Sequence, residues 1–379
     1  MKKILFVSTR NPYSGRYSGD VIRSFKIINL LKKKYEVDVA YLGKKNNDIV
    51  KGVNLISFNQ PNLFEKIFYC FVSLLKFEPM QFGLFFSKSM KNYISENSQN
   101  YDLIFFHHIR SYPYLPKNYY GKTILDMGDL YSDNYLQTFK YLNILNPLKY
   151  IYFFESFVVK NIEEKIFSSF DKVLLFSKKE VKSINKIYQD KIFQVDESIE
   201  KLNSKVKFST KKSNILFIGN LNYLPNILAV KDFAKNILPS LVKKDPNIKL
   251  CLIGNIKNID KYLLSKNKNI IILGSQKNIT KYFNKSFCGI ANLSIATGVQ
   301  VKVLTYMSYG LPVICSKQVA LNFQNNTLVY KSKDDLVNKI IEFKNNKSFW
   351  NKFSKKSISF VKKFKWKKIS LRYFQLIKV

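Results

Sequence analysis

The sequence predicts an α/β protein with two Rossmann-like domains, each built on a parallel sheet. The chain has 379 residues, 46% of them hydrophobic, which is enough for two cores of ordinary size. Short runs rich in β-branched and aromatic residues alternate with helical patterns, up to a polar stretch at residues 198–213, and then alternate again. The polar stretch therefore predicts a hinge between domains that cover residues 1–205 and 206–354.

Each domain is expected to contain five strands. The strands of the first domain are expected at residues 4–9, 37–42, 102–107, 122–127 and 172–177, with helices over 20–34 and 150–169. The strands of the second are expected at 215–219, 249–254, 270–274, 287–293 and 311–316, with helices over 226–242 and directly after Gly298. Ligands of such sheets bind at the carboxyl ends of the strands, so a cleft between the domains is the expected site.

The net charge of +37 comes almost entirely from lysine. Nucleic-acid readout favours arginine, and only five arginines are present, so a nucleic-acid partner is not expected. One explanation of the lysine excess is the codon bias of an AT-rich genome. The other is contact with an anionic membrane surface or with anionic substrates.

The four cysteines lie singly in apolar runs, at positions 70, 251, 288 and 315. This pattern predicts buried, reduced thiols, without a disulfide framework or a zinc site. The first residues read as a strand and not as a signal peptide, and the longest apolar patch, residues 67–75, is far shorter than the ~20 residues of a membrane span. We expect a cytoplasmic protein that does not cross a membrane.

A glycine followed by a helix marks the most informative part of the second domain. Gly298 allows a close backbone approach, the helix after it offers unpaired N–H groups, and Lys302 adds a positive charge in its first turn. A diphosphate would fit there. The alternative is an ordinary turn from strand to helix. Neither domain has the GxGxxG spacing of dinucleotide-binding folds, since the first loop carries only Gly15 and Gly19, four residues apart.

Four segments, in order along most of the chain, resemble one family. Residues 12–25, PYSGRYSGDVIRSF, resemble a first-turn signature PY…GDxIRS, and residues 126–132, DMGDLYS, resemble a DxxDxxS segment. Residues 215–230 resemble the opening of a second domain, and residues 298–313, GVQVKVLTYMSYGLPV, resemble a GxQNKVLEAMAxGxPV block. The chain is thereby similar to GT-B glycosyltransferases of family 4 (group 1), and more narrowly to sugar transferases of exopolysaccharide clusters.

The resemblance implies a fold and an activity. It implies two facing domains with an interdomain cleft, and a C-terminal tail, residues 355–379, that packs back on the first domain. It implies transfer of a sugar from a nucleoside-diphosphate donor to a surface glycan (capsule, O-antigen or exopolysaccharide) or lipid-linked glycan acceptor, with retention of configuration, and with no metal or other cofactor.

The resemblance also assigns roles to residues. The diphosphate would lie at the N–H groups of Gly298 and Val299, with Lys302 neutralising the leaving group. The other donor-site candidates are Thr297, Thr305, Asn220 and Gly274. The candidates for an acceptor or phosphate loop are Gly15, Gly19, Arg23, Arg110 and Asp129. Arg23 could equally be a cation on a helix surface.

The two histidines follow an apolar strand, where a cleft residue is expected. His107 and His108 are both catalytic candidates, together with Lys302. Alternating strand geometry lets only one histidine face the cleft, and we favour His108, because Arg110 can point the same way. The alternative is one core histidine and one solvated histidine.

Three departures from the family pattern bear on activity. Thr305 stands where the family usually has a glutamate that contacts the donor ribose, Thr297 replaces a charged residue, and Val301 replaces an asparagine. A neutral hydrogen bond in place of a charged one weakens donor binding by ~1 kcal/mol. A catalytically impaired GT-B subunit that partners an active transferase is therefore the alternative function.

Several further groups have two interpretations. Residues 63–78 place Phe64, Ile67, Phe68, Phe71 and Leu75 on one helical face, and we favour a core helix over a membrane-interface helix. The carboxylates at 126 and 129 lack the spacing of a metal-binding DxD, which favours acceptor contact or helix capping. The glutamates at 155, 163 and 164 are expected in surface or interdomain ion pairs.

Overall fold

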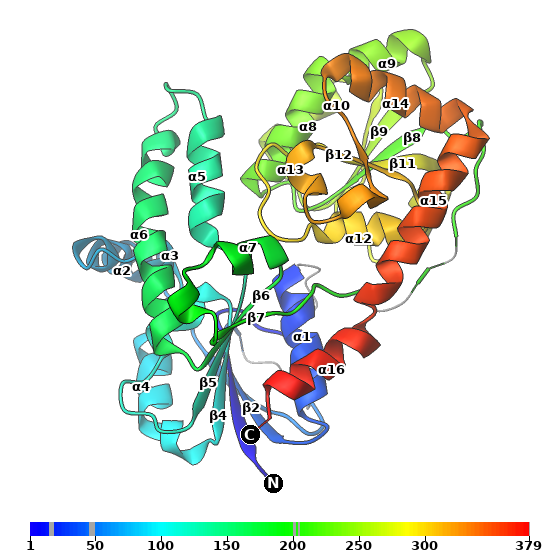
Figure 1. Cartoon of the computed structure of the whole chain (residues 1–379). Coiled ribbons are helices and arrows are strands. Elements are labelled where there is room, and N and C mark those ends of the chain that lie inside the picture. The colour runs from blue at the N-terminus through cyan, green and yellow to red at the C-terminus, as the bar shows by residue number, and fades with distance from the viewer. Residues whose placement is uncertain (15–18, 45–49, 200–201, 204, 379) are drawn as a thin grey trace. The chain divides into compact units, whose positions relative to one another are not determined.

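The computed structural model describes the chain except for residues 15–18, 45–49, 200–201, 204 and 379. The chain divides into two compact units (Figure 1). Unit 1 comprises Met1–Asp196 and Ser370–Val379, and unit 2 comprises Glu197–Ile369. Each unit holds one sheet in which all strands run parallel.

Unit 1 is built on a seven-stranded sheet with the order β3-β2-β1-β4-β5-β6-β7. Its strands are β1 (Lys3–Ser8), β2 (Glu36–Leu42), β3 (Asn54–Phe58), β4 (Leu103–His107), β5 (Lys122–Gly128), β6 (Lys172–Leu175) and β7 (Ile192–Gln194). The five predicted strands are confirmed. The two additional strands, β3 and β7, lie at the edges, where burial is incomplete and the apolar signal is weak.

The helices of unit 1 connect these strands. They are α1 (Gly19–Leu31), α2 (Leu63–Leu75), α3 (Met80–Leu84), α4 (Lys88–Asn97), α5 (Tyr131–Tyr141), α6 (Leu148–Ser169), α7 (Lys178–Ser183) and the 3₁₀ turns η1 (Ser98–Asn100), η2 (Ile109–Tyr114) and η3 (Lys186–Tyr188). Helix α16 (Trp366–Leu376) returns to unit 1 through its second half. The central strand β4 is fully buried, and β1 is buried after its first residue; Phe6 stacks on Phe105 with ring centroids 5.2 Å apart.

Unit 2 is built on a six-stranded sheet with the order β10-β9-β8-β11-β12-β13. Its strands are β8 (Asn214–Ile218), β9 (Lys249–Ile253), β10 (Ile270–Ile272), β11 (Ser286–Ala291), β12 (Val313–Cys315) and β13 (Leu328–Val329). Its helices are α8 (Leu224–Asn236), α9 (Leu238–Lys244), α10 (Asn258–Ser265), α11 (Thr280–Asn284), α12 (Val301–Ser308), α13 (Lys317–Ala320), α14 (Lys333–Asn345), α15 (Lys347–Val361) and the 3₁₀ turns η4 (Gln324–Asn326) and η5 (Lys362–Phe364).

Two expectations about unit 2 differ from the structure. The predicted helix over 226–242 is two helices, because Pro239 lacks an N–H and starts α9 instead of continuing α8. The predicted boundaries at 205/206 and 354/355 lie at 196/197 and 369/370. Ile199 belongs to the core of unit 2, and so do Trp350 and Phe364 of the C-terminal segment, which keeps these residues with unit 2.

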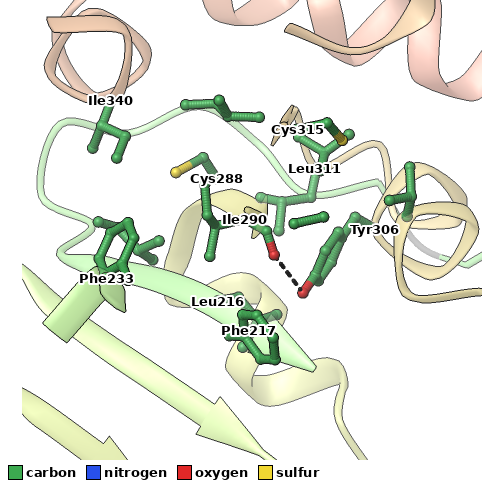
Figure 2. Packing of buried hydrophobic residues seen from close by; sticks show 14 of the residues in the cluster. Leu216, Phe217, Phe233, Cys288, Ile290, Tyr306, Leu311, Cys315 and Ile340 are labelled. Atoms are coloured by element: carbon green, nitrogen blue, oxygen red, sulfur yellow. Dashed lines mark hydrogen bonds between the residues drawn. The ribbon is translucent and has the colours of Figure 1, made fainter. Parts of the chain in front are cut away.

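The core of unit 2 positions α12 against the sheet (Figure 2). The hydroxyl of Tyr306 on α12 accepts a hydrogen bond from the N–H of Ile218 at 2.8 Å and donates to the carbonyl of Ile290 at 3.3 Å. Gly289 of β11 permits this approach, because a Cβ there would lie 2.6 Å from the tyrosine ring. Helix α12 is therefore held close to the ends of β8 and β11.

The cysteines are free, as predicted, but they are not all buried. Cys251, Cys288 and Cys315 are buried, and Figure 2 shows the latter two in the core of unit 2. Cys70 is half-buried, because it lies on a helix that exposes most of its surface. Within the described part of the chain, no helix is both long enough and apolar enough to cross a membrane.

Candidate functional site

The loop before α12 supplies the first part of a candidate anion site in unit 2. Gly298 has a positive φ of 59°, a left-handed conformation that favours glycine. The amide of Asn322 donates to the Gly298 carbonyl at 2.5 Å, and the amide of Gln300 donates to the Thr297 carbonyl at 2.9 Å. These two bonds engage the loop carbonyls of Gly298 and Thr297 directly before the helix. In the described structure, the N-cap residue Gln300 makes no side-chain bond to the first helical amides, so the helix end suits an anion.

Lys302 is a buried amine that pairs with no carboxylate of the described residues. Its side chain is 8% exposed, and its Nζ donates to Oδ1 of Asn226 at 2.5 Å and lies 4.2 Å from the centre of the Phe217 ring. Within the described residues, none of the ion pairs includes it. Burial lowers the pKa of Lys302 to about 7. An anion placed beside this amine would stabilise its charged form.

Glycines follow three neighbouring strands of the unit 2 sheet, and the first of them lies close to this amine. A Cβ on Gly219, after β8, would lie 3.3 Å from Nζ of Lys302. Gly254, after β9, packs so closely that its Cβ would lie 1.8 Å from the Gly219 carbonyl oxygen. The N–H of Gly254 donates to the carbonyl of Gly274, after β10, at 2.8 Å. Lys302 therefore lies at the carboxyl ends of the strands, where ligands of such sheets bind.

The other donor-site candidates lie around this point with different roles. Asn220 is exposed, and its carbonyl accepts from the Asn226 amide at 2.9 Å, so Asn226 joins Asn220 to Lys302. The sequence analysis missed Asn226, although it lies in the segment 215–230 that carries the resemblance. Val299 and Thr297 are half-buried in the loop. The hydroxyl of Thr305 donates to the Val301 carbonyl at 2.9 Å, within the helix itself.

In unit 1, the predicted roles of Arg23 are both wrong. Arg23 is 4% exposed, and its Nε and Nη2 donate to the two oxygens of Asp126 at 2.7 and 2.9 Å. Its guanidinium also lies 3.9 Å from the ring centre of Phe176. It is neither a surface cation nor positioned to bind a phosphate, because a buried carboxylate already occupies it. Burial would raise the pKa of Asp126, but Arg23 and then His107 outweigh burial and hold it well below its usual range.

This pairing also corrects two other assignments. Asp126 is buried and both of its carboxylate oxygens accept hydrogen bonds from Arg23, so it is a partner of Arg23 and not an exposed carboxylate. His107 is buried, with Nδ1 3.1 Å from Asp126 and Nε2 3.0 Å from the Asp20 carbonyl oxygen. Both ring nitrogens are therefore engaged, and His107 is a core residue and not a catalytic one. Gly19, the first residue of α1, is exposed, and Gly15 lies outside the described residues.

His108 has the properties of a reactive group. Its φ of 75° is unusual for a residue with a side chain, and such strain is frequent at functional sites. Its Nε2 forms a short hydrogen bond with the hydroxyl of Tyr131, while Nδ1 is buried without a hydrogen-bond partner in the described structure. Burial, followed by the charges of Arg110, His107 and Arg10, lowers the pKa of His108 well below its usual value. His108 is therefore a neutral imidazole, and its Nδ1 can donate or accept a hydrogen bond according to the tautomer.

A small polar cavity lies beside His108, at the carboxyl ends of β1 and β4. It has a volume of about 10 Å³, enough for one water molecule, and includes Arg10, Asp20, Ser8 and both histidines in its lining. Arg10 pairs with Asp20, with Nη1 2.6 Å from the carboxylate. The sequence analysis missed Arg10, although its position directly after the first strand could have indicated it.

Arg110 and Asp129 lie at the same edge of the sheet. Arg110 is half-buried, lies 4.7 Å from the ring centre of Phe85 and makes a long hydrogen bond of 3.4 Å to Gln81. Burial lowers its pKa. Asp129 is half-buried after β5, two residues before Tyr131. Arg110 lies close enough to His108 for its charge to lower the histidine pKa, and the role of Arg110 in an acceptor or phosphate loop stays a prediction.

The glutamates of α6 are not the surface pairs that the sequence predicts. Glu163 is buried and accepts hydrogen bonds from the N–H groups of Tyr131 and Ser132 at 2.7 and 3.1 Å, so it caps the start of α5. Burial raises its pKa to about 7, although the bonds from Ser132 oppose the shift. Glu155 is also buried and accepts from the N–H of Met80 at 3.1 Å, while Glu164 is exposed.

A family model and a curated relative each match part of the chain. Residues 212–346, all within unit 2, match the family model described as "Glycosyl transferases group 1". The chain is 27% identical over 285 residues to a protein of Klebsiella pneumoniae described as an uncharacterized 44.6 kDa protein in cps region. That alignment covers 68% of this chain and 66% of the relative, just under two thirds of its length.

Solved structures resemble the whole chain. TarM matches with a TM-score of 0.67 at 12% identity, over 100% of this chain and 99% of its own. HepE of Anabaena, solved with UDP and glucose, matches with a TM-score of 0.66 at 12% identity and the same coverage. WaaG, described as a glycosyltransferase involved in lipopolysaccharide biosynthesis, matches with a TM-score of 0.67 at 11% identity, over 99% of each chain. At these identities the matches show the fold, and they confirm the predicted GT-B architecture.

Proposed function

We propose that this chain, whose residues 212–346 are a group 1 glycosyltransferase domain within a GT-B fold, transfers a sugar from a nucleoside-diphosphate donor to a surface-glycan acceptor. The fold and the domain are the premise. The donor, the acceptor class and the retention of configuration are the proposal. The cps region of the Klebsiella relative supports a capsule-type acceptor, and the UDP and glucose bound to HepE support a uridine nucleotide.

The observation that carries the proposal is the buried amine of Lys302. It lies at the carboxyl ends of β8 and β9, beside the closely packed backbone of Gly219 and Gly254, and no carboxylate of the described residues neutralises it. A diphosphate would supply the missing negative charge and would raise the pKa of the amine from about 7, so that it is charged when the leaving group departs. The positive end of α12 would add to the same field.

The charge on the leaving diphosphate would thus be neutralised by protein groups, and we propose that the reaction needs no metal or other cofactor. Lys302 would hold the phosphates, and the N–H groups of Gly298 and Val299 would donate to them. His108 would hydrogen-bond, through Nδ1, a hydroxyl of the reacting sugar or of the acceptor. Arg110, near His108, would bind an anionic group of the acceptor.

The protein is proposed to work in the cytoplasm, where nucleotide sugars are made, and at the inner face of the membrane when the acceptor is lipid-linked. The three buried thiols and the half-buried Cys70, all unpaired, suit a reducing compartment. A membrane contact would be peripheral, through surface groups of unit 1.

Thermal unfolding against a panel of nucleoside diphosphates and nucleotide sugars tests the proposal. A ligand at about 100 times its dissociation constant stabilises a protein by about 2.7 kcal/mol, a readily measured shift. We expect UDP or a UDP-sugar to stabilise the wild type and to have little effect on Lys302→Met. Lys261→Met, which removes an exposed lysine of α10, is the matched control and should respond as the wild type does.

Transfer assays distinguish an enzyme from a binding subunit. If a nucleotide sugar stabilises the protein but purified protein neither transfers nor hydrolyses the sugar, the protein is a binding subunit. If no nucleotide stabilises the wild type, the proposed donor site is wrong.

A further inference from the structure

Helix α2 presents its apolar side chains to solvent. The face formed by Leu63, Phe64, Ile67, Phe68, Phe71, Leu74 and Leu75, here the α2 face, is exposed, and Phe64 is 83% exposed. The only buried residue of this helix is Ser73. A surface helix of a globular protein normally buries its apolar side and exposes its polar side. The expectation that residues 63–78 form a core helix is therefore wrong, and the α2 face needs a partner outside the fold.

Helix α2 is a stable helix whose orientation is fixed. The side chain of Asn62 accepts from the N–H of Glu65 at 2.9 Å, and the Glu65 carboxylate accepts from the N–H of Asn62 at 2.7 Å, which is a complete capping box. The opposite side of α2 packs on α3, where a Cβ on Gly83 would lie 2.3 Å from the backbone nitrogen of Cys70. The helix is thus held by its small residues.

Helix α3 in turn joins α2 to α6. The N–H of Met80, the first residue of α3, donates to the buried carboxylate of Glu155 in the middle of α6. The first half of α6 and the loop before it are also apolar and exposed. Their exposed apolar residues are Ile144, Leu145, Leu148, Tyr150, Ile151, Phe153, Phe154 and Phe157. In Figure 1, α2 projects at the side of unit 1, away from the strands.

Charge decides which partner fits this surface. Residues 67–75 contain no charged side chain, so burial of the α2 face would remove no charge from water. The whole chain carries +37, which repels a second copy and attracts an anionic surface. An apolar helix face on a strongly basic protein has the two features of an interfacial membrane anchor.

We propose that the α2 face docks into the interface of a membrane that contains anionic lipids. The apolar side chains enter the boundary between headgroups and acyl chains, while lysines elsewhere on the protein supply the electrostatic attraction. This inference rests on the proposed membrane contact of unit 1 and deepens it, and it involves neither the donor site nor the chemistry of transfer. It identifies the surface that would bring unit 1 to a lipid-linked acceptor.

Vesicle co-sedimentation of the full chain tests the inference. The probes are vesicles of equal parts phosphatidylglycerol and phosphatidylcholine, and vesicles of phosphatidylcholine alone. We expect binding to the first, weaker binding to the second, and weaker binding to both when salt is raised. The triple variant Phe64→Ser, Phe68→Ser, Phe71→Ser should raise the dissociation constant for anionic vesicles by about a hundredfold.

The matched control is a triple variant on α10 of unit 2, Ile259→Ser, Tyr262→Ser, Leu263→Ser, which also removes exposed apolar side chains. It should bind vesicles as the wild type does. The substituted side chains of both variants are exposed, so both variants should fold and should have the unfolding midpoint of the wild type.

Three results would overturn the inference. They are a wild type that does not bind anionic vesicles, an α2 variant that binds them as tightly as the wild type, and a wild-type dimer that the α2 variant converts to monomer. Nucleotide-induced thermal shifts should be equal in the wild type and the α2 variant, so failure of this inference and failure of the proposed function are distinguishable.

Discussion

Unit 1 and unit 2 both contain a buried cation near the carboxyl ends of strands, Arg23 and Lys302, and these two cations differ in what surrounds them. Arg23 of unit 1 donates two hydrogen bonds to Asp126, and a buried histidine contacts the same carboxylate. Lys302 of unit 2 contacts an amide oxygen and an aromatic ring, and burial lowers its pKa to about 7. A buried cation with an internal counter-ion supports the fold, whereas a buried cation without one is suited to bind an anion.

The largest expected effect is on stability, when the Arg23 pair is broken. Asp126→Asn leaves the guanidinium buried without its counter-ion, and we expect the free energy of unfolding to fall by about 3–5 kcal/mol. Asp335→Asn removes a carboxylate that pairs with Lys339 near the surface, and should cost less than about 1 kcal/mol. Urea denaturation measures both. Equal losses for the two variants would show that the Arg23 pair is no more important than a surface pair.

The second-largest expected effect is on ligand affinity, when Lys302 is replaced. Lys302→Met removes an amine whose burial in the ligand-free protein disfavours its charge, so stability should stay equal or rise slightly. The affinity for a nucleoside diphosphate should fall by about 2 kcal/mol, because a charge-assisted hydrogen bond to the anion is lost. Calorimetric titration and denaturation measure the two quantities. A large loss of stability without a loss of affinity would make Lys302 a structural residue like Arg23.

The third expected effect is a pH dependence of the free energy of unfolding, which Lys302 produces and Arg23 does not. The pKa of Lys302 is about 7 in the folded state and near 10.4 in the unfolded chain, so between these values the unfolded state binds more protons. Wild-type stability should therefore rise with pH in this window, by up to about 1.4 kcal/mol per pH unit relative to Lys302→Met. The Asp126 pKa lies below its usual range, so that pair contributes no slope here and loses stability only in acid. If the free energies of unfolding of the wild type and Lys302→Met changed in parallel with pH, this explanation would be contradicted.

The smallest expected effect concerns Thr305, which stands beside the anion site without charge. Its hydroxyl donates to the Val301 carbonyl of its own helix, whereas the resemblance described above implies a glutamate that contacts the donor ribose at this position. Thr305→Glu should strengthen nucleoside binding by about 1 kcal/mol, and Thr305→Val should change it by less than about 0.5 kcal/mol. Binding of UDP to the three proteins provides the measurement. A weaker Thr305→Glu complex would mean that this chain holds the ribose differently.

The sequence predicted the central strands of both sheets, because fully buried parallel strands produce continuous apolar runs such as Ile4–Val7. It did not predict β3, β7 and β13, which are short or partly exposed edge strands. It also did not predict the break at Pro239 or the exposure of α2. The pattern of Phe64, Ile67 and Phe71 identifies an apolar helical face, but it does not specify whether that face meets a core or solvent.

The candidate site was predictable in unit 2 and less so in unit 1. Gly298 and Lys302 are close in sequence, so local geometry places them at one helix end. Arg23 and Asp126 are 103 residues apart, and their pairing arises only when α1 packs against the carboxyl end of β5 in the folded unit. The same holds for His107, whose two partners come from α1 and β5. Side-chain partners brought together by topology carry no signal in a single sequence.

Proton uptake during nucleotide binding tests the central claim most directly. At pH 8 an amine with a pKa of about 7 is about nine-tenths neutral, and it must take up a proton when a diphosphate binds beside it. Calorimetric titration of a UDP-sugar in buffers of different ionisation enthalpy measures this uptake. We predict that the wild type takes up close to one proton per nucleotide and that Lys302→Met takes up none. Binding without proton uptake by the wild type would contradict the claim that Lys302 supplies the counter-charge of the donor.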